Sequence, residues 1–263
     1  MAGGLALALS GGGARGAFQV GVLDELIRVR KVEFETAAGT STGAIQAAGV
    51  VQDDITRLHD FWSELTGNSS IYRRRGGTIW PIITGKDSLY NPAPLKRLLH
   101  EMIDEEAVRT SRKNLRIAAV NLATSELRIL TEKDRNIADW VYASSAQPPF
   151  FPPYETRGAT GRIEQWVDGG VRDVIPLNAA LTERPRAVLV VRAEAPLPPS
   201  SKRFDTLVEI GLQSVELQTR EVGNSDIGHV DLMNRLLAAE PPRDCRRPFG
   251  LSYAAMAVSS SMA

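Results

Sequence analysis

The chain contains a single cysteine, Cys245, so it cannot form an internal disulfide. A protein without disulfides needs no oxidising compartment, and we therefore expect a cytoplasmic location. No apolar run reaches the roughly 18 residues that a membrane-spanning helix requires, which leaves only peripheral contact with a membrane. The opening MAGGLALALS is apolar but lacks the basic segment of a signal peptide, and we interpret it as a strand.

The chain also lacks an excess of charge of either sign, because 31 acidic side chains offset 31 basic ones. Proteins that bind nucleic acid present a positive surface to the phosphates, so we expect no nucleic-acid partner. With 263 residues, 43% of them hydrophobic, the chain is long enough to bury a large core. Neither a linker nor an internal repeat interrupts it, and we expect one domain over residues 1–263.

Histidine is scarce, and the three present are His59, His100 and His229. His59 and His100 lie in amphipathic segments, His229 lies in the C-terminal helical region, and no motif surrounds any of them. A serine hydrolase normally relies on histidine as its base. This scarcity therefore restricts the chemistry that is open to a reactive serine.

Strand and helix patterns alternate along most of the chain. Residues 5–9 form a short apolar run that ends in glycines, and a helical pattern follows from about residue 15. A second strand, turn and helix cover residues 34–51, and RAVLVVRA at 186–193 has the composition of a buried strand. This alternation predicts an α/β fold with a mostly parallel sheet covered by helices on both faces.

The C-terminal region predicts a long helix followed by a tail. In FDTLVEIGLQSVELQTREV, the residues Leu207, Ile210, Leu217 and Val222 keep only partly to one face, and we expect this helix to pack against the sheet. The final SYAAMAVSSSMA is small and polar, and we expect it to be frayed.

The segment SGGGARG, which follows the first strand, has three interpretations. Its Gly11, Gly13 and Gly16 satisfy the dinucleotide fingerprint G-x-G-x-x-G, and Glu33 or Glu35 would then hold a ribose. The segment could also be a simple tight turn. In the third interpretation, its backbone amides stand at the start of a helix and bind a negatively charged oxygen.

A serine stands between glycines in GTSTG, residues 39–43. Flanking glycines permit the strained strand-to-helix turn that exposes a nucleophilic hydroxyl, although a serine between glycines also occurs in ordinary loops. The carboxyl ends of parallel strands share one edge of a sheet, so Ser41 and the glycine loop would converge there. An α/β-hydrolase would place several strands before its serine and a catalytic histidine late in the chain. Here the serine follows one earlier strand, and the late histidine, His229, lies in no motif.

The candidate base for Ser41 is an aspartate. Asp168 ends a predicted strand and precedes Gly169 and Gly170, so little backbone would separate its carboxylate from the serine hydroxyl. Asp-Gly-Gly is also an ordinary turn sequence, and Asp173 is a competing candidate. The reference pKa of aspartate, near 3.9, makes it a weak base, but burial in a low-dielectric cleft would raise that pKa.

GGGARG, GTSTG and DGG occur in this order, and together they resemble the motifs of the patatin-like phospholipases. ASSAQPPFFPP is similar to the segment that precedes the DGG strand in that family, so the resemblance runs from about residue 5 to residue 195. It implies a three-layer α/β/α domain and hydrolysis of lipid acyl esters by a serine and aspartate dyad, with neither metal nor cofactor.

Carried onto this sequence, the resemblance makes Ser41 the nucleophile and Asp168 the base. Ser10 stands where plant members often carry aspartate. The resemblance assigns the oxyanion hole to Gly11, Gly12, Gly13 and Arg15, chiefly through the amides around Gly12 and Gly13. The remaining motif residues are glycines: Gly16, Gly39, Gly43, Gly169 and Gly170.

Two alternatives stay open beside a lipid acyl hydrolase: a nucleotide-binding protein that holds phosphates in GGGARG, and a catalytically silent scaffold that binds lipid. Phe150 and Phe151 would line an acyl pocket, contact a membrane or lie in the core. Arg73, Arg74 and Arg75 would meet anionic lipid headgroups or form a solvated loop.

Overall fold

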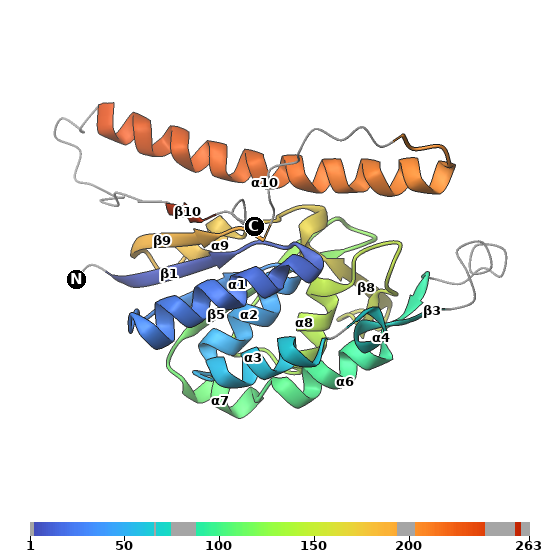
Figure 1. Ribbon diagram of the computed structural model, residues 1–263, viewed down its shortest axis with the longest axis horizontal. Helices are drawn as coiled ribbons and strands as arrows, with labels where there is room; N and C mark the ends of the chain where they lie inside the picture. The colour runs from blue at the N-terminus through green and yellow to red at the C-terminus, as the bar shows by residue number, and fades with distance from the viewer. Residues whose placement is uncertain (1–2, 66, 75–87, 194–202, 240–255, 259–263) are drawn as a thin grey trace.

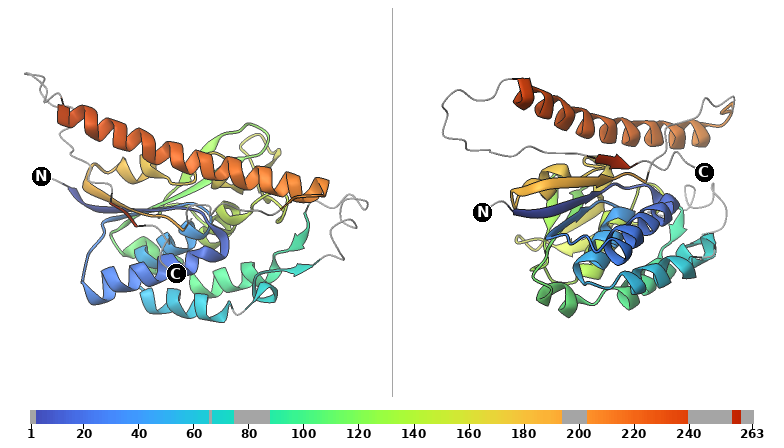
Figure 2. Two further views of the ribbon diagram at one scale, coloured as in Figure 1. Left: turned by 45° about the horizontal axis from the view of Figure 1, so that its top comes forward. Right: turned by 60° about the vertical axis from the view of Figure 1, so that its left-hand side comes forward.

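The computed structural model describes residues 3–65, 67–74, 88–193, 203–239 and 256–258. In these ranges the chain forms three layers, with a central sheet between helices on both faces (Figures 1 and 2). The α/β class and the layered arrangement that the sequence predicts are confirmed.

The central sheet has eight strands in the order β10-β9-β1-β2-β5-β8-β7, with β6 paired to β5 outside this path. Its strands are β1 (Gly3–Leu9), β2 (Thr36–Gly39), β5 (Asn114–Asn121), β6 (Leu127–Leu130), β7 (Tyr154–Arg157), β8 (Ile163–Asp168), β9 (Pro185–Val191) and β10 (Met256–Val258). Strands β10, β9, β1, β2 and β5 run parallel, whereas β6 and β8 run antiparallel to β5 and β7 runs antiparallel to β8. The sheet is thus mostly parallel, with an antiparallel part at one side.

Strand β1 shows how the sheet divides the core, because its side chains alternate between two faces. Leu7 and Leu9 belong to a large apolar cluster, and Ala6 and Ala8 belong to a smaller one. The large cluster involves α1 (Gly16–Leu23), α2 (Thr42–Val51), α3 (Ile55–Glu64), α6 (Ala93–Met102), α7 (Glu105–Thr110) and α8 (Ile137–Ser145). The smaller one involves α9 (Leu177–Leu181) and α10 (Leu207–Ala239).

Helix α2 follows Ser41 and is buried along its whole length. Its small residues let it approach the other elements closely, and Gly49 lies against Leu58 of α3. Helix α3 begins at a capped N-terminus, where the Asp54 carboxylate accepts a hydrogen bond of 2.8 Å from the Arg57 amide. The helix that follows Ser41 is therefore fixed between the sheet and α3.

The C-terminal region agrees with the sequence-based expectation in its helix but not in its tail. In α10, Ile210 and Leu217 are 49% and 48% exposed, whereas Val222 packs on the smaller cluster, so the apolar positions keep only partly to one face, as predicted. The predicted frayed tail is wrong for Met256–Val258, which pair with β9 as β10 because their backbone completes the sheet edge. Cys245 lies outside the described residues.

None of the helices within the described ranges combines the length and the apolar character needed to span a bilayer.

Candidate active site

A strained turn carries Ser41 between β2 and α2. Its backbone angles are φ 57° and ψ −124°, and such conformations cost residues with a side chain about 1–3 kcal/mol. The turn is also tight: a Cβ on Gly39 would lie 2.0 Å from the Gly43 carbonyl oxygen, and one on Gly43 would lie 2.2 Å from that of Leu9. Both motif glycines are therefore required for this turn to form.

Asp168 reaches the same region from a strand that runs in the opposite direction. Strand β2 pairs with β5 as far as Gly39, which stands opposite Ile117. Strand β8 pairs with the end of β5, where Asp168 stands opposite Ala119. Strand β6 pairs with β5 from Ile117 to Val120, on the edge of β5 opposite to β2. Strand β8 therefore pairs with β5 on the same edge as β2, beyond the point where β2 ends. The base candidate is thus brought to the end of β2, where Ser41 follows.

The Asp168 carboxyl group is buried, with 3% of the residue exposed. One oxygen, Oδ1, accepts a hydrogen bond of 2.7 Å from the Gly170 amide. Burial raises the pKa of Asp168 from 3.8 to about 7, against the opposing effects of this hydrogen bond and of the Ser41 hydroxyl. A carboxylate with a pKa near neutrality is a far better proton acceptor than an exposed one.

The Ser41 hydroxyl lies near enough to the Asp168 carboxyl group to lower the pKa of that group. The second carboxylate oxygen, Oδ2, is buried without a hydrogen-bond partner among the described residues. Catalytic hydrogen bonds in unliganded enzymes are often long and tighten when substrate binds. The arrangement suits a pair that closes in the substrate complex.

The glycine loop lies beside the serine, since a Cβ on Gly11 would stand 3.2 Å from that of Ser41. The Gly11 amide donates to the Val174 carbonyl at 3.1 Å, so it is already used. The amides of Gly12 and Gly13 meet no acceptor within the described residues. Of the three glycines that the sequence suggests for anion binding, two thus keep their donors available.

Two buried glutamines hold this loop. Gln19 Nε2 donates to the Ser10 carbonyl at 3.0 Å and to that of Val191 at 2.9 Å. Gln46 Nε2 donates to the Gly16 carbonyl at 3.1 Å and to the side-chain oxygen of Gln19 at 3.0 Å. Both ends of the loop are therefore tied to the helices α1 and α2 by amide groups that water cannot reach.

Two serine hydroxyls complete the framework. Ser144 Oγ accepts a hydrogen bond of 3.0 Å from the Ser41 amide, which steadies the strained turn. Ser10 Oγ donates to the Gly11 carbonyl and accepts from the Ala193 amide, both at 2.8 Å. The hydroxyl at position 10 thus performs a structural task at the start of the loop.

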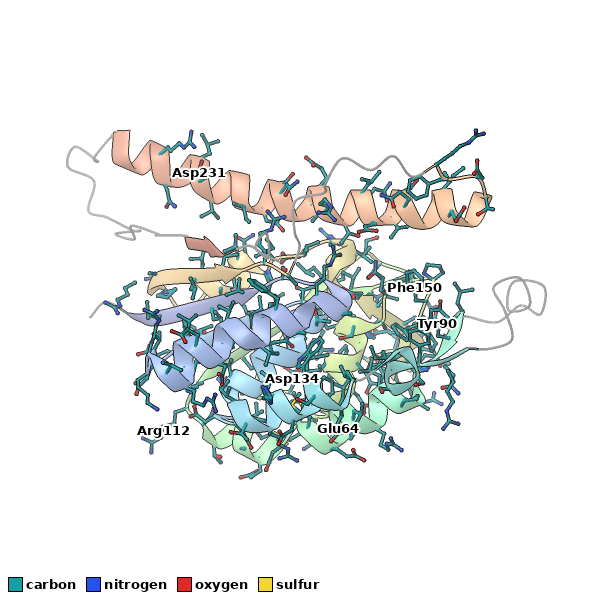
Figure 3. All side chains as sticks on the ribbon, in the orientation of Figure 1. Glu64, Tyr90, Arg112, Asp134, Phe150 and Asp231 are labelled. Carbon is teal, nitrogen blue, oxygen red and sulfur yellow. The ribbon has the colours of Figure 1, made fainter. Side chains whose placement is uncertain are left out.

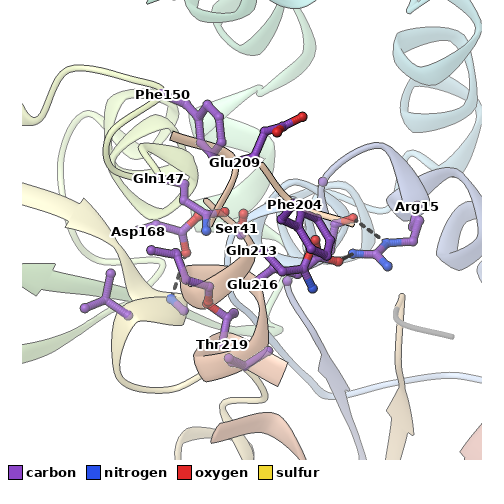
Figure 4. Close-up of a pocket in the computed structure, with 17 residues that line it drawn as sticks. Arg15, Ser41, Gln147, Phe150, Asp168, Phe204, Glu209, Gln213, Glu216 and Thr219 are labelled. Carbon is purple, nitrogen blue, oxygen red and sulfur yellow. Dashed lines mark hydrogen bonds and ion pairs between the residues drawn. The ribbon is translucent and has the colours of Figure 1, made fainter. Parts of the chain in front are cut away.

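A cavity of about 370 Å³ opens onto Ser41 and Asp168 (Figure 4). Its apolar lining consists of Phe150, Val171, Val174, Phe204 and Val215. Its polar lining includes Gln147 and four residues of α10: Glu209, Gln213, Glu216 and Thr219. The four recur at helical spacing on one face of α10, so a polar periodicity in the sequence marks this side of the cavity.

Comparison with known proteins decides the family. The family model for patatin-like phospholipases matches residues 7–181. The chain belongs to the patatin-like phospholipase family.

Several relatives of this patatin-like protein are detected at 25–27% identity. The uncharacterised protein YjjU of Escherichia coli is 25% identical over 192 residues, which cover 72% of this chain and 51% of YjjU. A cGAMP-activated phospholipase of Vibrio cholerae is 27% identical over 184 residues, which cover 56% of this chain and 49% of that phospholipase. The uncharacterised protein YqhO of Bacillus subtilis is 25% identical over 201 residues, which cover 69% of this chain and 68% of YqhO.

The patatin-like chain spans about half the length of the first two of these relatives. Among solved structures, VipD from Legionella pneumophila matches 98% of this chain and 61% of its own, with a TM-score of 0.44 and 17% identity.

Arg15, the charged residue of the patatin-like loop, lies at the far end of the cavity from Asp168 in Figure 4. Its Nε donates to the Gly12 carbonyl at 3.3 Å, and its guanidinium lies 3.8 Å from the Glu216 carboxylate of α10. The side chain is 43% exposed. Arg15 therefore braces the loop against α10 at the rim of the cavity.

The competing base and the nucleotide interpretation fit this patatin-like site less well. Asp173 is half-buried beside Asp226, and its partial burial and that neighbouring carboxylate raise its pKa to about 7, but it does not line the cavity. Glu35 accepts a hydrogen bond from the Gly4 amide at the amino end of β1, whereas the glycine loop follows the carboxyl end. A ribose held by that glutamate could not reach the loop.

The remaining candidates of the patatin-like chain lie elsewhere. His59 and His100 are exposed on α3 and α6, and His100 contacts Asp139 at 3.1 Å. His229 lies within α10. The side chains of Arg74 and Arg75 fall outside the described residues. The described residues contain no cluster of three or more acidic, histidine or cysteine side chains that could hold a metal ion.

Proposed function

We propose that this chain hydrolyses acyl esters of lipids, as a phospholipase A or lysophospholipase does, through Ser41 and Asp168. The observation that carries the proposal is the placement of a buried carboxyl group, with its pKa raised to about 7, at the strained serine turn. Lipid hydrolysis is the activity that the family relationship supports. The apolar lining of the cavity suits an acyl chain.

In the first half-reaction, the Ser41 hydroxyl oxygen attacks the ester carbonyl carbon while Asp168 accepts the hydroxyl proton. The carbonyl oxygen becomes an oxyanion, and the Gly12 and Gly13 amides stabilise it by hydrogen bonds. The bond to the leaving alcohol then breaks, Asp168 gives its proton to the alcohol oxygen, and the acyl group remains on Ser41.

In the second half-reaction, Asp168 takes a proton from a water molecule, and the resulting hydroxide attacks the acyl carbon. The bond to Ser41 breaks, the proton returns to the serine oxygen, and the fatty acid leaves. The charges and protons of the dyad end as they began.

A fluorophosphonate probe tests the proposal directly, because an activated serine displaces its fluoride and forms a covalent bond to phosphorus. We expect labelling at Ser41, located by mass spectrometry of the digested protein, and no labelling of Ser41→Ala. Ser63→Ala, which removes an exposed hydroxyl on α3, is the matched control and should label like the wild type. Absence of labelling together with measurable nucleotide affinity would favour a phosphate-binding loop, and absence of both would favour a silent lipid-binding scaffold.

The pH dependence of hydrolysis should report Asp168. The ionised carboxylate is the working base, so activity is present above its folded-state pKa and is lost as the pH falls through it. Because burial has raised this pKa from 3.8 to about 7, kcat/KM for an uncharged ester should fall about tenfold per pH unit below about pH 7.

Asp173 provides the matched control for this profile, since burial raises its pKa to about 7 as well. Asp173→Asn should keep the acid limb of the wild type. An acid limb near the ordinary value of 3.8, or a limb that disappears in Asp173→Asn, would contradict the assignment.

A further inference from the structure

A small hairpin, β3 (Arg73–Arg74) with β4 (Tyr90–Asn91), is attached to the wall of the catalytic cavity. The Leu89 amide donates to the Pro149 carbonyl at 3.1 Å, and the Tyr90 amide donates to the Phe150 carbonyl at 2.9 Å. The rings of Tyr90 and Phe150 are stacked, with centroids 6.0 Å apart and planes at 9°, and Figure 3 shows the two side by side. Since Phe150 lines the cavity, the hairpin extends that wall outward.

The hairpin also carries a partly exposed aromatic surface. Tyr72 stacks on Tyr90 with centroids 4.0 Å apart and planes at 17°, and both residues are only partly buried. Tyrosines combine an apolar ring with a polar tip, and they are enriched where proteins meet the headgroup region of a bilayer.

A second cavity, of about 380 Å³, lies next to the hairpin and contains basic and hydroxyl groups. Arg73 and Arg97 line it together with Ser69 and Ser70, and Glu64 is the carboxylate among its lining residues. Arg73 forms no ion pair with any described residue. The cavity therefore holds one net positive charge and several hydrogen-bond donors.

The second arginine of this cavity, Arg97, is also available to bind an anion. Arg97 pairs with Glu101 at 3.7 Å, but these side chains are 71% and 61% exposed. Ion pairs as exposed as this contribute little, so an anion of suitable shape can compete for the guanidinium. A guanidinium group donates hydrogen bonds in a planar fork that suits the oxygens of a phosphate group, and the neighbouring hydroxyls supply further donors.

We propose that this cavity binds the phosphate of an anionic phospholipid headgroup, and that the hairpin thereby docks the protein on an anionic bilayer. Docking there places the tyrosines at the bilayer surface and the Phe150 end of the catalytic cavity beside the lipid. The role that we assign to this docking, which is to bring lipid to the catalytic cavity, rests on the proposed function. Bilayer binding itself requires no hydrolysis.

Vesicle binding of the full chain carrying Ser41→Ala tests the docking site without lipid turnover. We expect this protein to bind vesicles that contain phosphatidylglycerol more tightly than vesicles of phosphatidylcholine alone. Adding Arg73→Gln and Arg97→Gln should lower the partition coefficient by about 30-fold, which corresponds to about 1 kcal/mol for each arginine. An unchanged melting temperature would show that the variant is folded.

The matched control removes two other exposed arginines, Arg28 and Arg30, whose side chains are 67% and 66% exposed. They belong to the segment that continues α1, which lies away from β3 in Figure 1. Arg28→Gln with Arg30→Gln changes the net charge equally and should keep the affinity. Equal losses in the two pairs, or none in the first, would overturn the docking site. If inorganic phosphate, at the same concentration as the lipid headgroups, displaced the protein from the vesicles, the cavity would be a site for free phosphate and the docking site would be overturned. Failure of serine labelling would count against the hydrolase alone.

Discussion

Ser41→Ala and Asp168→Asn should each reduce kcat/KM for an acyl ester by about 10⁴-fold or more, because each removes a group without which the acyl transfer cannot begin. Alanine has no attacking oxygen, and the asparagine amide cannot accept the serine proton. The measurement is hydrolysis of a chromogenic ester above pH 7, where the aspartate is ionised.

Folding should not account for the loss in Asp168→Asn. The raised pKa means that the folded protein prefers the neutral Asp168 carboxyl group. The contribution of this group to stability is therefore complete below pH 3.8 and is lost as the pH rises to about 7. Above that pH, the wild type carries a buried charge that asparagine lacks. The inactive variant should therefore melt at the same temperature as the wild type or higher.

The histidines and the second aspartate supply the controls for the dyad. His59→Ala, His100→Ala, His229→Ala and Asp173→Asn should each retain most of the activity. A folded but inactive His229→Ala would show that a histidine takes part after all. Activity in Asp168→Asn combined with its loss in Asp173→Asn would move the base to Asp173.

Gly13→Val should lower kcat by about 100-fold with little change in KM, since an oxyanion donor contributes on the order of 3 kcal/mol to the transition state. Gly13 has φ 58°, a region that residues with a branched side chain avoid, and open space surrounds it. Valine would therefore fit sterically but would shift the backbone and its amide.

Gly21→Val is the matched control for this substitution. Gly21 also has open space for a side chain, but it lies within α1 at an ordinary helical φ. The substitution should leave kcat near the wild-type value. A folded Gly13→Val protein with full activity would remove the loop from the oxyanion site.

Much of the fold could be predicted from the sequence, because local patterns specify most of its elements. The apolar run that forms β1, the strand that precedes Ser41 and the buried strand in RAVLVVRA all occur where the pattern indicates. The glycines at 39 and 43 point to a tight turn for a reason that is itself local, namely the lack of a Cβ. These features depend on residues close in the chain.

The parts that could not be predicted depend on pairing between distant segments. The sequence does not reveal that β8 pairs antiparallel with β5 just beyond the end of β2. That pairing depends on which edge of β5 is left unpaired by the other strands. Nor does the sequence reveal that the Val174 carbonyl accepts the hydrogen bond of the Gly11 amide, because these two residues lie far apart in the chain. The polar residues of α10 that line the cavity cannot be predicted from its apolar positions, since those keep only partly to one face.

The contacts that frame the serine turn also have a consequence for the protein during its synthesis. Hydrogen bonds from Thr40 to Asp173, from Ser41 to Ser144 and from Ala193 to Ser10 join residues 133, 103 and 183 positions apart. Contacts of such sequence separation cannot form until both partners have left the ribosome, and they are slow to form in folding. A nascent chain that ends before β8 carries Ser41 but lacks Asp168, the base that we propose. Such a chain would be inert toward the lipids of the cell that makes it.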